Sequence, residues 1–486
     1  MELANWGATP GGSYNRVLST TRSFGIAHFG GALFCAERTP EHAALYREDE
    51  EAVRMSFGMS LHRKLRLAYF VSHPIQYQAP MLRRLAREPD IDLTVFFASD
   101  HSVKGYADKG LGGVQVKWDV PLLTGYRYEF LPSIRHATGT NFWAPINRGF
   151  YRALKRGKFD AVWLHGYWSV NSISTMVAAK LLGIPLLERV DSTLNDRPRS
   201  SFRLAIKRVF FSIVKHFIHA VLPISSMNRD YWAHYLGPDF PSFMVPYAVD
   251  NTYFQSAIAI ASCSREEFRQ QLSLEQDRPV ILFASKLLSR KRCTDLIDAY
   301  LGIRPTPGSK RPYLLIVGDG SERAACEAKI RAAGEADVRF FGFQNQSKLA
   351  PFYDLCDVFV LPSARDSFAL TVNEVMNAGK TIIVSNDMGN QSDLITDGVN
   401  GKVFPAGNVE ALRAAIVAVL GDDDGRHEMG RRSLERINQW SFEEDIRGLR
   451  KALHHVAGLP LRTHAEDPVA DMHRDAQALA TTLDCP

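Results

Sequence analysis

Apolar runs and amphipathic stretches alternate along most of the chain. From residue 65 the order is an apolar strand LRLAYFV, a polar loop, the helical stretch MLRRLARE and the strand LTVFFAS. Further strands are predicted at 161–166, 184–190 and 220–225, with helical stretches such as 172–183 between them. Apolar strands separated by helices are typical of parallel sheets covered on both faces, so the pattern predicts a doubly wound α/β fold.

A second series of the same kind follows the segment MVPYAVDNTYF (244–254), which carries Pro246 and a turn at Asp250 and Asn251. Its strands are predicted at 279–288, 313–320, 338–343, 358–363 and 381–387, and a last helix at 442–456. The pattern therefore predicts two α/β domains. We expect them at 61–248 and 249–460, with a poorly patterned extension at 1–60 and a polar tail at 461–486.

Length and composition agree with two soluble domains. The chain has 486 residues, 45% hydrophobic and 23% charged, and no run approaches the roughly 18 apolar residues that span a membrane. Its net charge of +5 suits anionic substrates or membrane surfaces but is not that of a nucleic-acid-binding protein. The six cysteines are scattered and the N-terminus lacks a signal-peptide pattern. We therefore expect a cytoplasmic protein without a metal site.

Basic residues gather after the first strand of the second series. The loop SKLLSRKR places Lys286, Arg290, Lys291 and Arg292 at the entry of a helix, whose first amides also attract anions. Ligands of open α/β sheets bind at the carboxyl ends of the strands, so this loop is typical of a diphosphate pocket. The alternative is a solvated basic loop.

A second loop, at 362–379, carries two carboxylates eight residues apart, Asp366 and Glu374. Carboxylates accept hydrogen bonds from vicinal sugar or ribose hydroxyls. The helix that begins here offers unpaired amides to phosphate oxygens, at Phe368, Ala369 and Leu370. The alternative is that both acids only complement the helix dipole.

These features together resemble the C-terminal domain of retaining glycosyltransferase family 4. In the family's order, residues 280–405 have Ser285-Lys286-Leu287, Lys291, Val317-Gly318-Asp319-Gly320, Phe340-Phe341-Gly342, Pro362-Ser363, Asp366-x7-Glu374, Gly389-Asn390 and Asn400-Gly401. A weaker likeness covers about 65–250, notably at PYAVD and Phe254. The resemblance implies the GT-B fold, in which two Rossmann-like domains enclose the active site in an interdomain cleft.

The resemblance also assigns donor-binding residues. It implies that Lys286 and Lys291, with Arg290 beside them, hold the diphosphate of a nucleotide sugar. Asp366, in place of the family's Glu, would meet the donor sugar, and Glu374 the ribose. The turn at Gly318 belongs to the same pocket, and Phe343 would lie near the base. Lys286 replaces an Arg, which keeps the charge but loses the two-pronged donor.

In the first domain the family's usual His is replaced by Asp191, in LLERVDST. His165, in WLHGYW, and His73, in SHPIQY, are candidates to face the acceptor, although a lone His is alternatively a structural hydrogen-bonder. Gln76 shares the loop of His73. Tyr167 and Trp168 suit stacking on a sugar face, with interdomain packing as the alternative. We predict catalytic roles for Asp366, His165 and Asp191, and an acceptor side of His73, Gln76, Tyr167 and Trp168.

The stretch 200–220 predicts a helix with an apolar stripe of Phe202, Ile206, Val209, Ile213 and Phe217. Its other side combines basic and apolar residues, namely Arg203, Lys207, Arg208 and Lys215 with Leu204 and Phe211. This mixed side suits docking on anionic lipid, and hence a peripheral location at the inner face of a membrane. The alternative is an ordinary amphipathic domain helix.

The sequence thus predicts a glycosyltransferase of polysaccharide or glycoconjugate biosynthesis. It would move a sugar, with retention and without a metal or other cofactor, from a nucleotide-diphosphate sugar to a glycan or lipid-linked acceptor. The replacements at Lys286, Asp191 and Asp366 motivate one alternative, a nucleotide-sugar-binding protein without transfer activity. A GT-B nucleotide-sugar epimerase is another.

Overall fold

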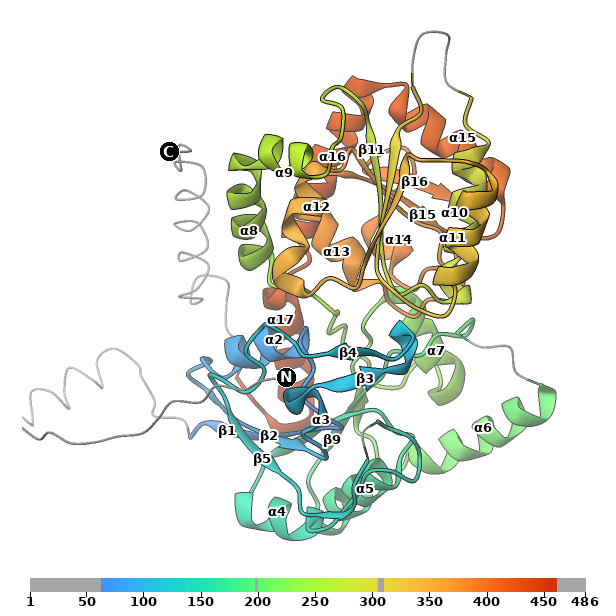
Figure 1. The fold of residues 1–486 in the computed structure, drawn as a ribbon. Helices are drawn as coiled ribbons and strands as arrows, with labels where there is room; N and C mark the ends of the chain where they lie inside the picture. The colour runs from blue at the N-terminus through green and yellow to red at the C-terminus, as the bar shows by residue number, and fades with distance from the viewer. Residues whose placement is uncertain (1–62, 138, 197–199, 305–309, 461–486) are drawn as a thin grey trace, which may run out of the picture. The chain divides into compact units, whose positions relative to one another are not determined.

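The computed structural model describes residues 63–460 except 138, 197–199 and 305–309. Two six-stranded sheets flanked by helices make up this part of the chain (Figure 1). The extension predicted at 1–60 and the tail predicted at 461–486 lie outside the described residues. No helix within the described ranges is long and apolar enough to cross a membrane.

The first sheet is parallel throughout, in the order β10-β9-β8-β1-β2-β5. Its strands are β1 (Leu65–Val71), β2 (Ile91–Phe97), β5 (Arg127–Phe130), β8 (Ala161–His165), β9 (Leu186–Arg189) and β10 (Ala220–Val221). Its helices are α2 (Gln78–Leu85), α3 (His101–Lys104), α4 (Phe150–Gly157), α5 (Val170–Leu182), α6 (Ser201–Val214) and α7 (Ser226–Leu236). Apolar side chains of α2 pack on one face, and those of α4 to α7 pack on the other.

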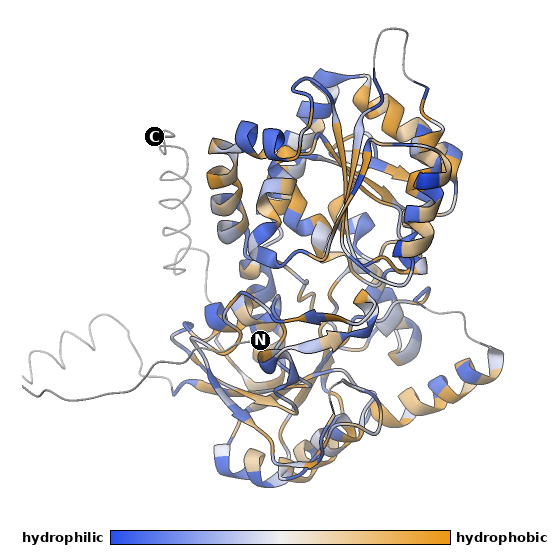
Figure 2. Cartoon of the chain, in the orientation of Figure 1, coloured by the Kyte–Doolittle hydropathy of each residue, from blue (hydrophilic) through white to orange (hydrophobic). Residues whose placement is uncertain are grey.

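The second sheet is also parallel, in the order β13-β12-β11-β14-β15-β16. Its strands are β11 (Val280–Ala284), β12 (Tyr313–Val317), β13 (Val338–Gly342), β14 (Val358–Leu361), β15 (Thr381–Ser385) and β16 (Gly401–Phe404). Its helices are α8 (Asn251–Cys263), α9 (Arg265–Gln271), α10 (Cys293–Leu301), α11 (Arg323–Ala332), α12 (Ala350–Leu355), α13 (Leu370–Met376), α14 (Gln391–Leu394), α15 (Val409–Leu420) and α16 (Asp423–Asn438). Figure 2 shows its central strands as largely hydrophobic, because helices cover both faces.

Both sheets reverse their strand order at a central strand, which is β1 in the first and β11 in the second. The loops that leave the two strands at such a point diverge to opposite faces and open a crevice at the carboxyl ends. His73 and His165 lie in or next to the loops after β1 and β8, while Lys291 and Asp366 follow β11 and β14. The topology therefore gathers the candidate residues at the two switch points.

The predicted strands and helices occur in the predicted order, but β5 and β16 were not predicted and several boundaries are wrong; the strand expected over 279–288, for example, ends at Ala284. The helix expected to begin at Met81 begins at Gln78. The helix expected over 200–220 ends at Val214, where tight turns follow and the chain enters β10. That strand covers only Ala220–Val221 rather than 220–225, since Pro223 has no N–H to donate to a ladder. The short antiparallel pairs β3 (Tyr106–Asp108) with β4 (Val114–Val116), and β6 (Ser133–Arg135) with β7 (Ile146–Asn147), had no clear sequence signal.

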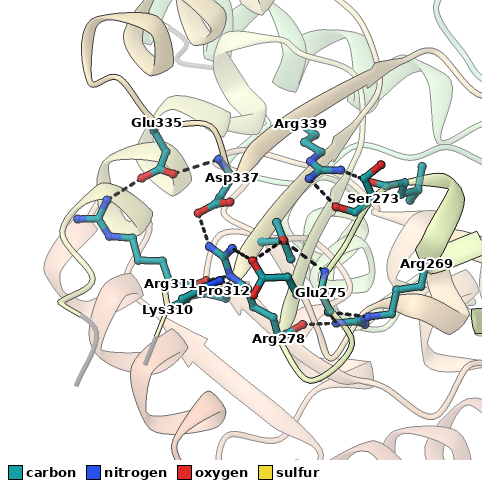
Figure 3. A network of polar contacts seen from close by, with 12 residues as sticks. Arg269, Ser273, Glu275, Arg278, Lys310, Arg311, Pro312, Glu335, Asp337 and Arg339 are labelled. Carbon is teal, nitrogen blue, oxygen red and sulfur yellow. Dashed lines mark hydrogen bonds and ion pairs between the residues drawn. The ribbon is translucent and has the colours of Figure 1, made fainter. Parts of the chain in front are cut away.

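A polar network closes the amino end of the second sheet, opposite the candidate site (Figure 3). Arg278, just before β11, donates to the carbonyl oxygen of Arg311 and pairs with Asp337, which precede β12 and β13. Its guanidinium also lies 4.1 Å from the centre of the Tyr313 ring. These contacts tie together the starts of three adjacent strands, so we interpret the network as structural.

The terminal helix α17 (Phe442–Ala457), predicted with the second domain, packs against α2 and β8 of the first. Arg84 Nε donates to Glu443 at 2.9 Å, and Arg450 pairs with Asp90 at 2.6 Å and with the buried Glu88. The chain thus returns to the first sheet after completing the second. The domain limits 61–248 and 249–460 stay a prediction.

Arg450→Met should lower the free energy of unfolding by about 3 kcal/mol, because it removes the cation that Glu88 and Asp90 share and leaves the buried Glu88 carboxylate with Arg84 alone. Urea unfolding followed by circular dichroism measures the loss. Arg447→Met is the matched control, since Arg447 pairs with Glu444 on the exposed side of the same helix and should cost less than about 1 kcal/mol. Equal losses in the two variants would contradict the role of Arg450.

Candidate active site

The basic loop after β11 and the acidic loop after β14 meet directly. Asp366, 4% exposed, accepts a hydrogen bond from Arg290 Nη1 at 2.9 Å and another from Lys291 Nζ. Burial opposes ionisation of Asp366, but the charges of Lys291 and Arg290 outweigh it and hold its pKa below the usual value. Burial lowers the pKa of Lys291, which the ion pair with Asp366 opposes. The three side chains form a compact charged cluster with one excess positive charge.

The pairing brings together side chains for which the family resemblance implied different partners. It implied that the bases meet the diphosphate and Asp366 the sugar, and in the structure Asp366 offsets one of the two positive charges. The side chain of Lys291 is 9% exposed and committed to Asp366, whereas those of Arg290 and Lys286 are each 43% exposed. Arg290 and Lys286 are therefore the cations that can turn toward a ligand.

Lys286 reaches the first domain. Its Nζ lies 2.8 Å from Asp108 Oδ2, and the same carboxylate accepts the backbone N–H of Gly110 at 2.7 Å. The next glycine, Gly112, lies against Gly320 so closely that an added Cβ would be 3.7 Å from the Gly320 carbonyl carbon. This loop was not predicted to belong to the site, although the glycine-rich run GLGG at 110–113 could have indicated it.

The turn at Gly318 and Gly320 can form only with glycine. Gly318 has φ +136°, and a Cβ there would collide with the carbonyl oxygen of Ser285. Gly320 has φ +156°, and a Cβ would collide with the carbonyl oxygen of Leu287. The two glycines let the end of β12 pack on the loop that carries Lys286, which fixes that loop beside the cluster.

Glu374 lies in α13 and accepts a hydrogen bond from Tyr353 Oη at 2.6 Å. Burial raises its pKa to about 7, against the opposing effect of that hydrogen bond. Asp366 and Glu374 thus differ in charge near neutral pH, as expected for carboxyl groups with different tasks. The prediction of an unpaired amide at Ala369 is wrong, because the Ala369 N–H donates to Asn390 Oδ1 at 3.1 Å. The amides of Phe368 and Leu370 flank it where α13 begins.

The two candidate histidines of the first domain are neutral hydrogen-bonding groups. Tyr247 Oη lies 3.1 Å from His165 Nε2, and burial, then the Arg189 charge, lowers the pKa of His165 to about 3. His73 Nδ1 contacts Ser72 Oγ at 2.8 Å, and burial with the neighbouring His101 lowers its pKa to about 3. A base with so low a pKa has little driving force to take a proton at neutral pH.

Tyr247 contacts site residues of both the first and the second sheet, and the sequence did not predict it as a site residue. Its hydroxyl contacts His165, and its ring centre lies 5.3 Å from that of Phe368, next to the acidic loop. Its carbonyl oxygen accepts Trp440 Nε1 at 2.9 Å. The PYAVD segment was interpreted only as a junction, and nothing in its pattern indicates which side chains its tyrosine meets.

The remaining candidates occupy different surroundings. Asp191 is exposed just after β9. The pKa of Tyr77 is raised to about 12, chiefly by desolvation and next by the charge of Asp191. Gln76 lies in the turn before α2, but it is Gln78 whose side chain approaches His165, at 3.5 Å. Phe343 packs at 6.2 Å against Trp118 of the first domain.

A pocket of about 640 Å³ opens beside His165 and is lined by Tyr167, Trp168 and residues of α6. The Tyr167 ring is 7% exposed and packs on Phe211 within the first domain, so little of its face is open. Trp168 is 60% exposed. Of the two predicted stacking residues, Trp168 is the one with an accessible ring. No group of three or more His, Cys, Asp or Glu side chains in the described ranges could hold a metal ion.

Comparison with known proteins agrees with this geometry. Residues 264–436 match the family model described as Glycosyl transferases group 1. An uncharacterized glycosyltransferase of Methanocaldococcus jannaschii is 32% identical over 157 residues, which are 32% of this chain and 39% of the relative. The D-inositol 3-phosphate glycosyltransferase of Nocardia farcinica is 26% identical over 42% of this chain and 46% of its own length. The chain thus spans less than half the length of these relatives.

Solved structures share the arrangement of both sheets. HepE of Anabaena, in complex with UDP and glucose, matches with a TM-score of 0.60 at 16% identity, over 80% of this chain and 99% of that one. A glycosyltransferase of Rickettsia africae matches with a TM-score of 0.63 at 17% identity, over 81% and 99%. The expected GT-B fold, with two Rossmann-like domains, is confirmed.

Glu374→Gln should flatten the dependence of stability on pH. The pKa of Glu374 is raised from 4.5 to about 7 in the folded state, so this group makes the wild-type protein lose stability as pH rises from 4.5 to about 7. A shift of that size corresponds to at most about 3 kcal/mol, which the uncharged Gln removes. Urea unfolding at several pH values measures the difference between variant and wild type.

Glu410→Gln is the matched control, since the Glu410 side chain is 70% exposed, and its profile should follow that of the wild type. Parallel profiles for Glu374→Gln and the wild type would contradict the raised pKa.

Proposed function

We propose that this protein is a glycosyltransferase that moves a sugar from a nucleotide-diphosphate sugar to a glycan or lipid-linked acceptor. One observation carries the proposal: the basic loop after β11 and Asp366 of the loop after β14 meet at the switch point of the second sheet, and Glu374 lies in the helix that follows the acidic loop. All of them lie within the stretch that matches the glycosyl transferases group 1 model. Cations beside hydroxyl-binding carboxylates are what a nucleotide sugar requires.

In this proposal Arg290 and Lys286 hold the donor diphosphate. Both are partly exposed, and each is paired with a carboxylate that a phosphate oxygen can replace as acceptor. Lys291 stays with Asp366 and keeps that carboxylate ionised beside the donor sugar. Negative charge develops on the departing diphosphate during transfer, and the preorganised cations stabilise it.

Glu374 has the ribose as its proposed partner. With a pKa near 7 and a hydrogen bond from Tyr353, its carboxyl group can accept or donate to a vicinal diol. The first domain supplies the acceptor side through the pocket beside His165. Gln76 belongs to the same proposed side, and Asp191 keeps its proposed catalytic role.

We infer that transfer proceeds with retention of configuration. Support comes from the resemblance of 280–405 to a retaining family and from the low pKa of both His165 and His73, which makes them poor general bases. The bond from the anomeric carbon to the diphosphate breaks while the bond to the acceptor oxygen forms. The departing diphosphate then takes the acceptor's proton. A cytoplasmic location, no required metal and a place in polysaccharide or glycoconjugate biosynthesis belong to the same proposal.

The test of the donor site is thermal unfolding of the full chain with UDP, GDP, ADP and their common sugar conjugates. One nucleotide should raise the melting temperature, because a ligand at 100 times its Kd stabilises by about 2.7 kcal/mol. Arg290→Met should reduce that shift by at least half, since a charge-assisted contact to phosphate is lost.

The control for this test is Arg413→Met, which removes an arginine of similar exposure on α15 and should leave the shift unchanged. If no nucleotide at millimolar concentration raises the melting temperature, the donor-site assignment is wrong.

The pairing of Asp366 with two cations favours one second candidate, a nucleotide-sugar-binding protein without transfer activity, because the sugar-facing carboxylate is already engaged. Asp366→Asn separates the two functions. For a transferase, turnover should fall about 100-fold or more while the nucleotide-dependent thermal shift persists. Release of the nucleoside diphosphate, with and without added glycan acceptors, measures turnover. A wild-type protein that is stabilised by a nucleotide sugar but never turns it over would support the second candidate.

A further inference from the structure

The outward face of α6 is apolar. Phe202, Ile206, Val209 and Ile213 recur at helical spacing and are 74%, 50%, 61% and 57% exposed; we call them the α6 stripe. The opposite face packs inward through the fully buried Phe211 and through Val214. Figure 2 shows α6 as mainly hydrophobic. No part of the described chain therefore covers this stripe.

The prediction that the mixed basic and apolar side of α6 docks on lipid is wrong in part. That side combined basic residues with Leu204 and Phe211, yet Phe211 is buried and Lys207 lies 4.4 Å from the centre of the Tyr231 ring. Arg203 and Arg208 are exposed and flank the α6 stripe on either side. A surface helix with an apolar face between cations has the composition that adsorbs to anionic bilayers.

The neighbouring helices extend the positive charge. Over their full lengths α4, α5 and α6 contain no Asp or Glu, and they carry seven basic residues: Arg152, Lys155, Arg156, Lys180, Arg203, Lys207 and Arg208. All three pack on the same face of the first sheet. Lys180 Nζ donates to the carbonyl oxygen of His216, just past the end of α6, at 3.0 Å. Each basic residue near an anionic surface contributes attraction.

The acceptor pocket opens along the edge of this helix. Arg203, Ile206 and Phe210 line it, so Ile206 belongs both to the pocket and to the α6 stripe. Phe142, Trp168 and Phe210 line it as a row of rings, with centres 5.0 Å apart from Phe142 to Trp168 and 5.4 Å from Trp168 to Phe210, and the Trp143 ring lies next to that row, 4.8 Å from Phe142. Trp143 and Trp168 are both more than half exposed. Exposed tryptophans at such a rim suit the headgroup level of a membrane.

We propose that α6 lies on an anionic membrane through its apolar stripe, and that the pocket beside it receives the head of a lipid-linked acceptor from that surface. The second half rests on the proposed function, whereas membrane adsorption does not. A second copy of the chain is a poorer occupant, because a symmetric dimer would place this basic face against itself. Anionic lipid complements both the charge and the apolar stripe.

Flotation of the full chain with lipid vesicles tests the adsorption. The protein should float with vesicles of phosphatidylcholine containing about 30% phosphatidylglycerol, bind pure phosphatidylcholine at least tenfold less, and be released at high salt. Val209→Asp/Ile213→Asp should lower the partition coefficient at least tenfold, because it places two anions on the apolar stripe.

Ile260→Asp on α8 is the matched control, since Ile260 is 71% exposed but belongs to the second domain, and it should float like the wild type. All three proteins are first compared by thermal unfolding, so that a folding defect is recognised. Wild-type protein that does not float, or a stripe variant that floats equally, would overturn the proposal. So would a wild-type dimer that the stripe variant converts to monomer without loss of vesicle binding.

Tryptophan quenching tests the position of the pocket mouth. Vesicles with brominated acyl chains should quench the fluorescence of the bound protein, and Trp143→Phe/Trp168→Phe should remove most of that quenching while flotation persists. Quenching that is unchanged in the variant would place the mouth away from the bilayer and overturn the lipid-linked acceptor.

Failure of this inference is distinguishable from failure of the proposed function. Stabilisation by a nucleotide depends on Arg290 and its neighbours in the second domain, and the stripe variant should retain it fully. A protein that binds nucleotide but not vesicles would overturn only the membrane proposal. One that binds vesicles but no nucleotide would overturn the donor site and leave adsorption standing.

Discussion

The buried guanidinium of Arg189 holds the two domains' chain segments together. Arg189, 1% exposed at the end of β9, donates to the carbonyl oxygens of Val245 and Pro246 at 2.8 and 2.9 Å. Its charge also lies 4.5 Å from the Tyr247 ring centre and near Asp445 of the returning helix α17. A buried cation is tolerated only when such partners surround it, so the junction is fixed where the polypeptide passes between the sheets.

That fixed junction determines what the site can do. Tyr247 is held so that it contacts His165 of the first sheet and Phe368 of the second, and His165 stays neutral because burial and the nearby Arg189 charge disfavour its protonation. The half-exposed cations of the candidate site, Arg290 and Lys286, lie instead in the loop after β11 of the second sheet. This asymmetry fits the proposed reaction, in which cations of the second sheet bind the charged donor and neutral hydrogen-bonding groups of the first sheet bind the acceptor.

The surface of the first domain shows a second asymmetry. Its acid-free helices α4 to α6 cover one face of the sheet, whereas on the other face α17 forms ion pairs with Arg84 of α2 and with Asp90 in the loop after α2. An exposed apolar stripe lowers solubility in water. This stripe lies at the rim of the pocket that we propose for a lipid-linked acceptor, where an apolar surface would have a function. The basic charge of these helices, the exposure of the α6 stripe and the position of the pocket therefore all support the proposed membrane adsorption.

The sequence by itself predicted most strands of the two large sheets and their order, and its resemblance to a known family implied the GT-B class, but it did not indicate β5 or β16. Apolar runs such as Leu65–Val71 and Val280–Ala284 are long and uninterrupted, so burial on both faces follows from composition alone. The residue types of the donor loops were also readable. Their partners were not, because periodicity identifies a face of an element without identifying what covers it.

Only the tertiary structure decided that Lys291 neutralises Asp366, that Tyr247 bridges the sheets and that the apolar side of α6 faces outward. Each depends on contacts between residues tens to hundreds of positions apart, which local pattern does not encode. The pKa values of His165 and Glu374 follow from the same cause, since burial by distant segments sets their electrostatic surroundings.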